Sequence, residues 1–132
     1  MLLIFLKFAN SSPHYYQPDV RIGIKKKAPI CKQIVDENSH VFCHIVAQVV
    51  GQAIPLVNTY TTGQMASLKM NSPSIIRGIR KGLIGACQGE IRKITIPPGY
   101  AYKESYIDGL FPPDSSWYVE IEVVEVMAGD SV

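Results

Sequence analysis

A change of hydrophobic period in the second half of this 132-residue chain constrains its fold more than any other feature. Apolar residues recur at helical spacing from Ser74 to Leu83, and Asn71-Ser72-Pro73 before them supplies a capping side chain and a proline suited to a first turn. Three glycines then break the helical pattern: Gly82, Gly85 and Gly89. Alternation with a period of two follows from Arg92 to Ile96, and Pro97-Pro98-Gly99 ends it because proline cannot donate to a strand ladder. The sequence therefore predicts one short helix that leads into a strand and then a loop.

Three other segments alternate with a period of two, which is typical of strands that turn one face toward a core. Residues 20–25 alternate as on a half-buried strand, and Asp36-Glu37-Asn38-Ser39 predicts a turn before the next strand. From Val41 to Val49 the apolar side chains share one face. The last segment places Trp117, Val119, Ile121 and Val123 on one side and Tyr118, Glu120 and Glu122 on the other. Antiparallel strands with one helix predict an α+β fold, in which a sheet wraps around a single short helix.

The composition fits one compact domain and argues against two classes of partner. Thirteen basic and eleven acidic residues give a net charge of +2, and the only basic run is Lys25-Lys26-Lys27, which is more typical of a solvated strand end than of a nucleic-acid-binding face. No apolar stretch approaches the ~20 residues that a membrane helix requires. We therefore expect no nucleic acid, no membrane span and a monomeric protein.

The first residues allow two interpretations. Met1 to Ala9 is apolar but short and is interrupted by Lys7, so it is either an atypical or truncated secretory signal or an ordinary N-terminal strand. Asn10-Ser11-Ser12 is a glycosylation sequon, which matters only if the chain enters the secretory route. We expect an extension or linker at residues 1–19, a domain at residues 20–127 and a short tail at residues 128–132.

His40, Cys43 and His44 are close enough in sequence to be considered as metal ligands. Residues four apart on a strand lie ~13 Å apart, and Cys43 points to the opposite face. Zinc ligands must lie ~2 Å from one ion, so this group predicts no metal site. The sequence also contains no Ser/His/Asp arrangement, phosphate-binding loop or carboxylate pair with interpretable spacing, and we expect no cofactor.

Several motifs in order resemble the FKBP-type peptidyl-prolyl isomerases. They are Ile76-Arg77-Gly78, the Gly-Leu-x-Gly-x-Cys-x-Gly-Glu turn at 82–90, Arg-Lys-Ile-Thr-Ile-Pro-Pro at 92–98, Tyr-Ala-Tyr at 100–102, and Pro112-Pro113. The resemblance covers roughly residues 20–127 and is much weaker between Gln48 and Met65. It implies the same sheet-around-helix architecture, and it implies an isomerase that acts on proline-containing peptide segments of client proteins.

The resemblance also implies which positions form the pocket. Ile75 and Ile76 stand where family members donate a backbone N–H to a ligand. Tyr102 matches the tyrosine whose hydroxyl donates to a bound carbonyl, and it is the candidate catalytic residue. Phe111 matches the apolar residue before the double proline. These elements are intact.

Other pocket positions differ from the family pattern. Ile79 replaces the tryptophan of the pocket floor, and Ile45 replaces a tyrosine. A phenylalanine-aspartate pair falls on Leu56 and Val57, and two further aromatics fall on Ala66 and Val119. Because each lost aromatic side chain could bury ~150–250 Å², the pocket is expected to be either wider or collapsed. We therefore predict an isomerase of weak or no activity, with two alternatives: a non-catalytic peptide- or protein-binding module, or an inert product.

The cysteines bear on the cellular compartment. The spacing of Val-Arg-Ile-Gly-Ile-Lys-Lys-Lys-Ala-Pro-Ile-Cys at 20–31 resembles the endoplasmic-reticulum branch of the family, in which cysteines at the positions of Cys31 and Cys87 are paired. This pairing leaves Cys43 as a buried free thiol. The alternative is three reduced core cysteines in a cytoplasmic protein. The resemblance thus favours the endoplasmic reticulum or secretion.

Overall fold

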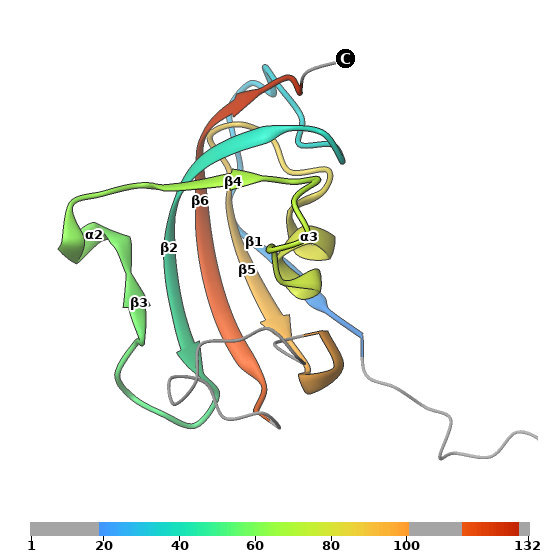
Figure 1. Cartoon of the computed structure of the whole chain (residues 1–132). Coiled ribbons are helices and arrows are strands. Elements are labelled where there is room, and N and C mark those ends of the chain that lie inside the picture. Colours follow the sequence, from blue (N-terminus) through green and yellow to red (C-terminus); the bar gives the residue numbers. More distant parts are fainter. Residues whose placement is uncertain (1–18, 101–114, 130–132) are drawn as a thin grey trace, which may run out of the picture.

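The computed structural model describes residues 19–100 and 115–129, in which a six-stranded antiparallel sheet curves around one short helix (Figure 1). The predicted α+β architecture is confirmed. The elements in chain order are β1 (Arg21–Lys26), β2 (His40–Val49), β3 (Val57–Asn58), α2 (Thr59–Thr62), β4 (Ala66–Lys69), α3 (Arg77–Leu83), β5 (Ile91–Ile96), η2 (Pro98–Tyr100) and β6 (Trp117–Met127).

The two long central strands, β2 and β6, each turn one face toward the core. Their side chains alternate between buried and half-buried throughout β2 and from Trp117 to Val123 in β6, as the period-two pattern predicted. The registers Cys43↔Val123, Ile45↔Ile121 and Ala47↔Val119 place apolar pairs opposite each other on the core face. Near Val124 the register shifts by one residue, and this bulge restores the inward direction at the end of β6.

The outer edge of β2 is shared by two short strands. β3 pairs with β2 at Val46 and Ala47, and β4 pairs with residues 40–43. Between them the chain forms α2, a single turn that the sequence did not predict. Its first residue, Thr59, is buried, and its hydroxyl accepts a hydrogen bond from the Ile45 N–H at 2.8 Å. Because β3 pairs with β2 here, it lies beside the core face at the point where the pocket described below is found.

Helix α3 differs from its prediction in two respects. It begins at Arg77 after the N-cap Ile76, which has no side-chain cap, whereas Asn71-Ser72-Pro73 lies in a preceding turn closed by Ser72 N–H donating to the Lys69 carbonyl. Gly82 does not break the helix but lies inside it. A β-carbon at this position would come within 2.6 Å of Ile94, so only glycine fits without a shift of the core. The glycine therefore lets the helix pack closely on β5.

The two later glycines and the prolines act as predicted. Gly85 and Gly89 have φ values of +89° and +96°, which other residues rarely adopt, and they shape the turn between α3 and β5. β5 ends at Ile96, and Pro98 begins a short 3₁₀ turn. After α3 ends at Leu83, the chain therefore returns to the sheet and begins β5 at Ile91.

The prediction of a half-buried strand at residues 20–25 is wrong in its burial. Ile22 and Ile24 are 46% and 47% exposed, although β1 exists and pairs with β5 in the predicted strand conformation. β1 lies at one end of the sheet, where it has a neighbouring strand, β5, on one side only. Within the residues that the structure describes, no helix has the length and apolar character needed to cross a membrane.

Candidate functional site

A pocket of 480 Å³ lies between the core face of the sheet and the N-terminal part of α3. This volume falls in the range of small-molecule and peptide side-chain sites. Strands β2, β3, β4 and β6, helix α3 and the loop before the helix all contribute to its wall. The described lining residues are Ile45, Ala47, Val57, Ser67, Leu68, Lys69, Ser72, Ser74, Ile75, Ile76, Ile79 and Trp117.

The pocket exists because the helix covers only part of the sheet. Gly78 and Gly82 bring α3 onto Ile96 and Ile94 of β5, which are completely buried. The helix therefore sits over one side of the sheet and leaves the β2 side open. There Ala47 has only a methyl group, and the space above it is bounded by the surrounding aliphatic side chains.

Five of the predicted site residues line this one pocket. They come from four different segments of the chain, and they are Ile45, Val57, Ile75, Ile76 and Ile79. Leu56 is 38% exposed and does not line the pocket, and Ala66 packs against the core and does not line it. Val119 is fully buried in the sheet and does not line it either. Tyr102 and Phe111 lie outside the described residues.

Sequence reasoning missed Trp117 as a pocket residue. It is the first residue of β6, only 3% exposed, and it lines the pocket together with Ala47. The alternation of β6 had placed its side chain on the core face, so the signal was present. The mapping of family positions nevertheless pointed to Val119, two residues further along the same face.

The lining is suited to bind an apolar group rather than to transfer protons. Most of its members are aliphatic side chains, and no carboxylate or imidazole is among the described lining residues. The polar side chains stand in β4 and in the loop before α3, where the Ser72 and Ser74 hydroxyls hydrogen-bond to each other at 2.8 Å. Such a site could hold a small ring by burial and leave its polar groups to the rim.

Arg80 fixes the loop that carries Ile75 and Ile76. From α3, its Nε donates to the Met70 carbonyl at 2.9 Å, and its Nη2 donates to the Ser72 carbonyl at 2.6 Å. A planar guanidinium that binds two backbone carbonyls in this way is rigid. These two hydrogen bonds therefore join the loop wall of the pocket to the helix.

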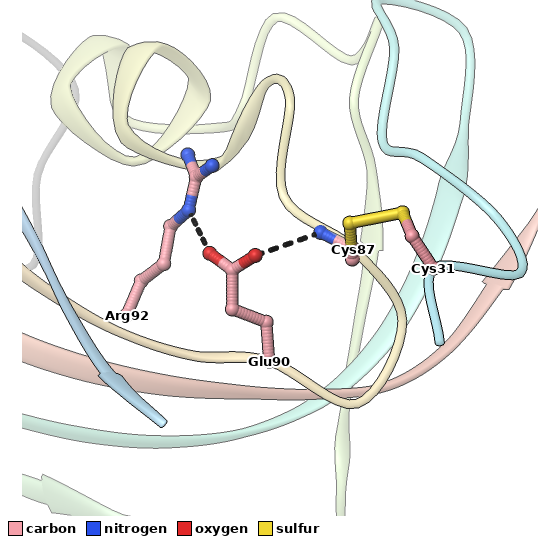
Figure 2. The surroundings of a disulfide bond; sticks show 4 residues. All are labelled: Cys31, Cys87, Glu90 and Arg92. Carbon is pink, nitrogen blue, oxygen red and sulfur yellow. Dashed lines mark hydrogen bonds and ion pairs between the residues drawn. A yellow bond between two sulfur atoms is a disulfide. The ribbon is translucent and has the colours of Figure 1, made fainter. Parts of the chain in front are cut away.

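A second polar cluster ties the other end of α3 to a disulfide (Figure 2). Cys31 and Cys87 are joined, which is the pairing that the resemblance implied. Glu90, 5% exposed, accepts the Cys87 N–H at 3.1 Å with Oε1 and an N–H of Arg92 with Oε2. Arg92 Nη1 in turn donates to the carbonyls of Gly82 and Ile84 at 2.8 and 3.2 Å, where α3 ends. The disulfide, β5 and the helix end thus form one connected support.

Cys43 is the remaining thiol, and it lies in the core face of β2. Desolvation by burial raises the pKa of this thiol to about 12. The thiol is therefore protonated at neutral pH, and it acts as a small apolar core residue.

The two strand histidines have hydrogen-bonding partners on the outer face of the sheet. His40 Nε2 lies 2.6 Å from Ser67 Oγ, and His44 Nδ1 lies 2.9 Å from Thr59 Oγ1. The His44 ring also stacks on Tyr60, with ring centroids 4.3 Å apart. In residues 19–100 and 115–129, no group of three or more His, Cys, Asp or Glu side chains is arranged to hold a metal ion.

Comparison with known proteins identifies the family. Residues 31–124 match the family described as FKBP-type peptidyl-prolyl cis-trans isomerase, which is well over half of the chain. This chain belongs to that family.

Similar sequences come from fungi and animals. The chain is 33% identical over 96 residues to FK506-binding protein 2A of Rhizopus delemar, a match that covers 73% of this chain and 58% of that protein. It is 28% identical over 127 residues to peptidyl-prolyl cis-trans isomerase FPR2 of Saccharomyces cerevisiae, covering 95% and 94%. Human peptidyl-prolyl cis-trans isomerase FKBP9 is 27% identical over 117 residues, which are 87% of this chain but only 20% of that protein. The chain thus spans 58% of the Rhizopus relative and nearly all of the yeast one.

Two solved structures share the fold. The crystal structure of FkpA from Escherichia coli superimposes with a TM-score of 0.73 at 21% identity, covering 84% of this chain and 49% of that one. AtFKBP13 gives a TM-score of 0.69 at 18% identity, covering 82% and 93%. At these identities the likeness concerns the fold, and the side chains of the pocket must be judged from this chain itself.

Proposed function

We propose that this chain binds proline-containing peptide segments in the pocket between the sheet and α3, and isomerises their X–Pro bonds weakly or not at all. The observation that supports the proposal most is the 480 Å³ pocket with a mainly aliphatic lining. Family members described as peptidyl-prolyl isomerases act on X–Pro bonds, so a proline ring is the natural occupant of such a pocket. Burial of the ring then supplies the binding free energy.

Catalysis of this reaction makes and breaks no covalent bond. The barrier of ~18–20 kcal/mol comes from amide resonance, which is lost when the bond twists. An enzyme lowers it only by binding the twisted imide more tightly than the planar forms. That preference requires donors and walls that fit the twisted geometry closely, in addition to a dry site.

The changed residues support weak turnover. Ile79 and Ile45 stand where the resemblance expects a tryptophan and a tyrosine, and Val57 stands where it expects an aspartate of the Phe-Asp pair. Aliphatic side chains at these positions keep the pocket apolar, but they hold a proline ring less specifically than aromatic walls. Without an acceptor at Val57, the pocket also has one group fewer to orient the peptide. We therefore favour binding with little acceleration, which is the behaviour of a peptide-binding module.

The disulfide supports an oxidising compartment. Disulfides persist in the endoplasmic reticulum and outside the cell, whereas cytosolic thiols are kept reduced. The bond between Cys31 and Cys87 also connects to the support of α3. We propose that the chain works in the endoplasmic reticulum or after secretion, on client proteins that fold there.

One experiment measures binding and turnover together. Acetyl-Ala-Ala-Pro-Ala-amide is titrated into the protein while the fluorescence of the protein's single tryptophan, Trp117, is recorded. The cis–trans exchange of the same peptide is followed by NMR. Saturable binding with slow exchange is expected, and the all-alanine peptide should bind more weakly. Rapid exchange would contradict the loss of activity, and the absence of binding would overturn the proposal.

A pair of variants locates the binding. Val57 stands on the edge strand β3 at the pocket and is 37% exposed, so Val57→Arg should block the pocket without disturbing the core. Val50 is 53% exposed and does not line the pocket, so Val50→Arg is the matched control. Loss of peptide binding in the first variant alone is expected. Equal binding by both would show that the peptide sits elsewhere.

A further inference from the structure

Strand β1 leaves one edge of the sheet open. It is the blue strand of Figure 1, and among the described strands only β5 pairs with it. The backbone N–H and C=O groups of β1 that point away from β5 therefore have no strand partner in the described part of the chain. Such an edge can accept an extended segment of another protein, which then adds a strand to the sheet.

The inner face of this edge is apolar. Ile22 pairs with Ile94, which is completely buried beneath α3, so Ile22 and Ile24 turn toward the helix side of the sheet. Their side chains are nevertheless 46% and 47% exposed, because the helix does not extend over the edge strand. An added strand would cover both isoleucines with apolar side chains at alternate positions.

The outer face of the same edge is basic. Arg21, Gly23 and Lys25 alternate with the two isoleucines and therefore share the outer face. Gly23 has no side chain, and its β5 partner Lys93 reaches over it, since the Lys93 Cε lies 3.7 Å from the position that a β-carbon of Gly23 would take. Three cationic side chains thus lie along β1 on its outer face.

Two carboxylates lie near these cations, and both have partners. Glu120 of β6 is opposite Lys93 in the strand register and forms an ion pair with Lys25 at 3.1 Å. Asp19 is bound to a lysine of α3 at 2.8 Å. Within the described residues, neither Arg21 nor Lys93 forms an ion pair. The outer face at the open edge therefore keeps a net positive charge.

We propose that the open edge of β1 binds an extended segment of a partner protein in which acidic and apolar residues alternate. The acidic side chains would face Arg21, Lys93 and Lys25, and the apolar side chains would cover Ile22 and Ile24. No residue of β1 is among the described residues that line the pocket. This surface is therefore separate from the pocket, and the inference does not depend on the proposed function.

A second copy of this chain fits the edge less well than an acidic segment. Two antiparallel β1 strands centred on Gly23 would place Arg21 opposite Lys25 on both sides of the centre. Like charges directly opposite each other destabilise a strand pair, and lysines on an edge commonly oppose self-association. The same charges favour an acidic strand, because opposite charges at these positions attract each other.

An NMR titration with acetyl-Glu-Val-Glu-Val-Glu-amide tests the proposal. This peptide matches the five positions from Arg21 to Lys25, and it has no proline, so its binding is independent of the proposed proline site. We expect the amide signals of residues 21–25 to shift, and we expect the β1 N–H groups that point away from β5 to exchange more slowly with solvent. Acetyl-Glu-Glu-Val-Val-Glu-amide has the same composition without the alternation and should bind more weakly. Equal binding of the two peptides, or no shift in residues 21–25, would overturn the proposal.

Three variants separate the edge from the overall charge. Arg21→Glu should weaken binding of the alternating peptide about three- to tenfold. Lys32→Glu is the matched control, because it changes the net charge equally at an exposed position outside the strands, and its affinity should stay within about twofold of the wild type. Ile22→Thr keeps a branched β-carbon and should also weaken binding, since it removes apolar contact on the inner face.

Two further results would contradict the proposal. Equal weakening in Arg21→Glu and Lys32→Glu would show that net charge alone governs the binding. Sedimentation of the protein without peptide tests the competing occupant, and a dimer with slowly exchanging β1 amides would assign the edge to a second copy of this chain.

Discussion

Replacing Arg92 with methionine should destabilise the protein by about 3–5 kcal/mol, the range for removing one partner of a buried ion pair. Glu90 is 5% exposed and would remain as a buried charge whose only described side-chain partner had gone. The carbonyls of Gly82 and Ile84 at the end of α3 would also lose their donor. Methionine keeps the length and apolar stem of arginine, so packing changes little.

Urea unfolding at neutral pH, followed by circular dichroism with the disulfide intact, measures this cost. Glu90→Gln combined with Arg92→Met removes both charges and leaves an acceptor for the Cys87 N–H, so the double variant should be more stable than Arg92→Met alone. Lys25→Met is the matched control, because Lys25 forms an exposed pair with Glu120 at 3.1 Å. It should cost less than about 1 kcal/mol.

Two results would refute this reasoning. If Arg92→Met lowered the free energy of unfolding no more than Lys25→Met does, the Glu90–Arg92 pair would contribute no more to stability than an exposed ion pair. If the double variant were less stable than Arg92→Met, the uncompensated Glu90 carboxylate would not be the source of the loss.

Three further predictions follow from the same structure. Gly82→Ala should lower the free energy of unfolding by about 1–3 kcal/mol, and with it the melting temperature, in spite of alanine's better helix propensity, because its β-carbon would lie 2.6 Å from a core side chain. Gly23→Ala, whose β-carbon would lie 3.7 Å from its nearest neighbour, should be tolerated. Reduction of the Cys31–Cys87 bond, or its replacement by two alanines, should cost about 2–4 kcal/mol in urea unfolding, and an unchanged midpoint would contradict this. Cys43 should resist alkylation at pH 8 until the protein unfolds; since its raised pKa of about 12 favours the neutral thiol, its burial stabilises the fold below the ordinary thiol pKa and this contribution is lost as the pH rises toward 12. Rapid labelling of native protein would contradict the last prediction.

The parts of the fold that follow from local pattern were predictable. The alternation from Val41 to Val49 and from Trp117 to Val123 is a direct record of burial on a pleated strand, and the structure reproduces it. The end of β5 was equally predictable from Pro97-Pro98-Gly99, where the strand stops at Ile96. In each case the signal lies within about ten residues of sequence.

What depended on neighbours distant in sequence was not predictable from pattern. Ile22 alternates correctly, but its exposure follows from the place of β1 at the end of the sheet. Gly82 resembles a helix breaker until Ile94 of β5 is seen beneath it. Ile75 and Ile76 continue the helical spacing into a loop because both pack against the core before the helix begins.

The pocket shows the same division. Residues near the helix could be mapped from the family motifs, and Ile75, Ile76 and Ile79 indeed line one cavity. Trp117 could not be assigned in that way, since its place beside the cavity depends on how β6 pairs with β5 and β2.

We propose that this pocket accepts a proline-containing peptide but accelerates its isomerisation little. The most direct test is the cis–trans exchange rate of acetyl-Ala-Ala-Pro-Ala-amide at concentrations of protein that saturate binding. We expect saturable binding with exchange close to the uncatalysed time of about 10–100 s. Turnover in the usual enzymatic range of about 1–10³ s⁻¹ would contradict it.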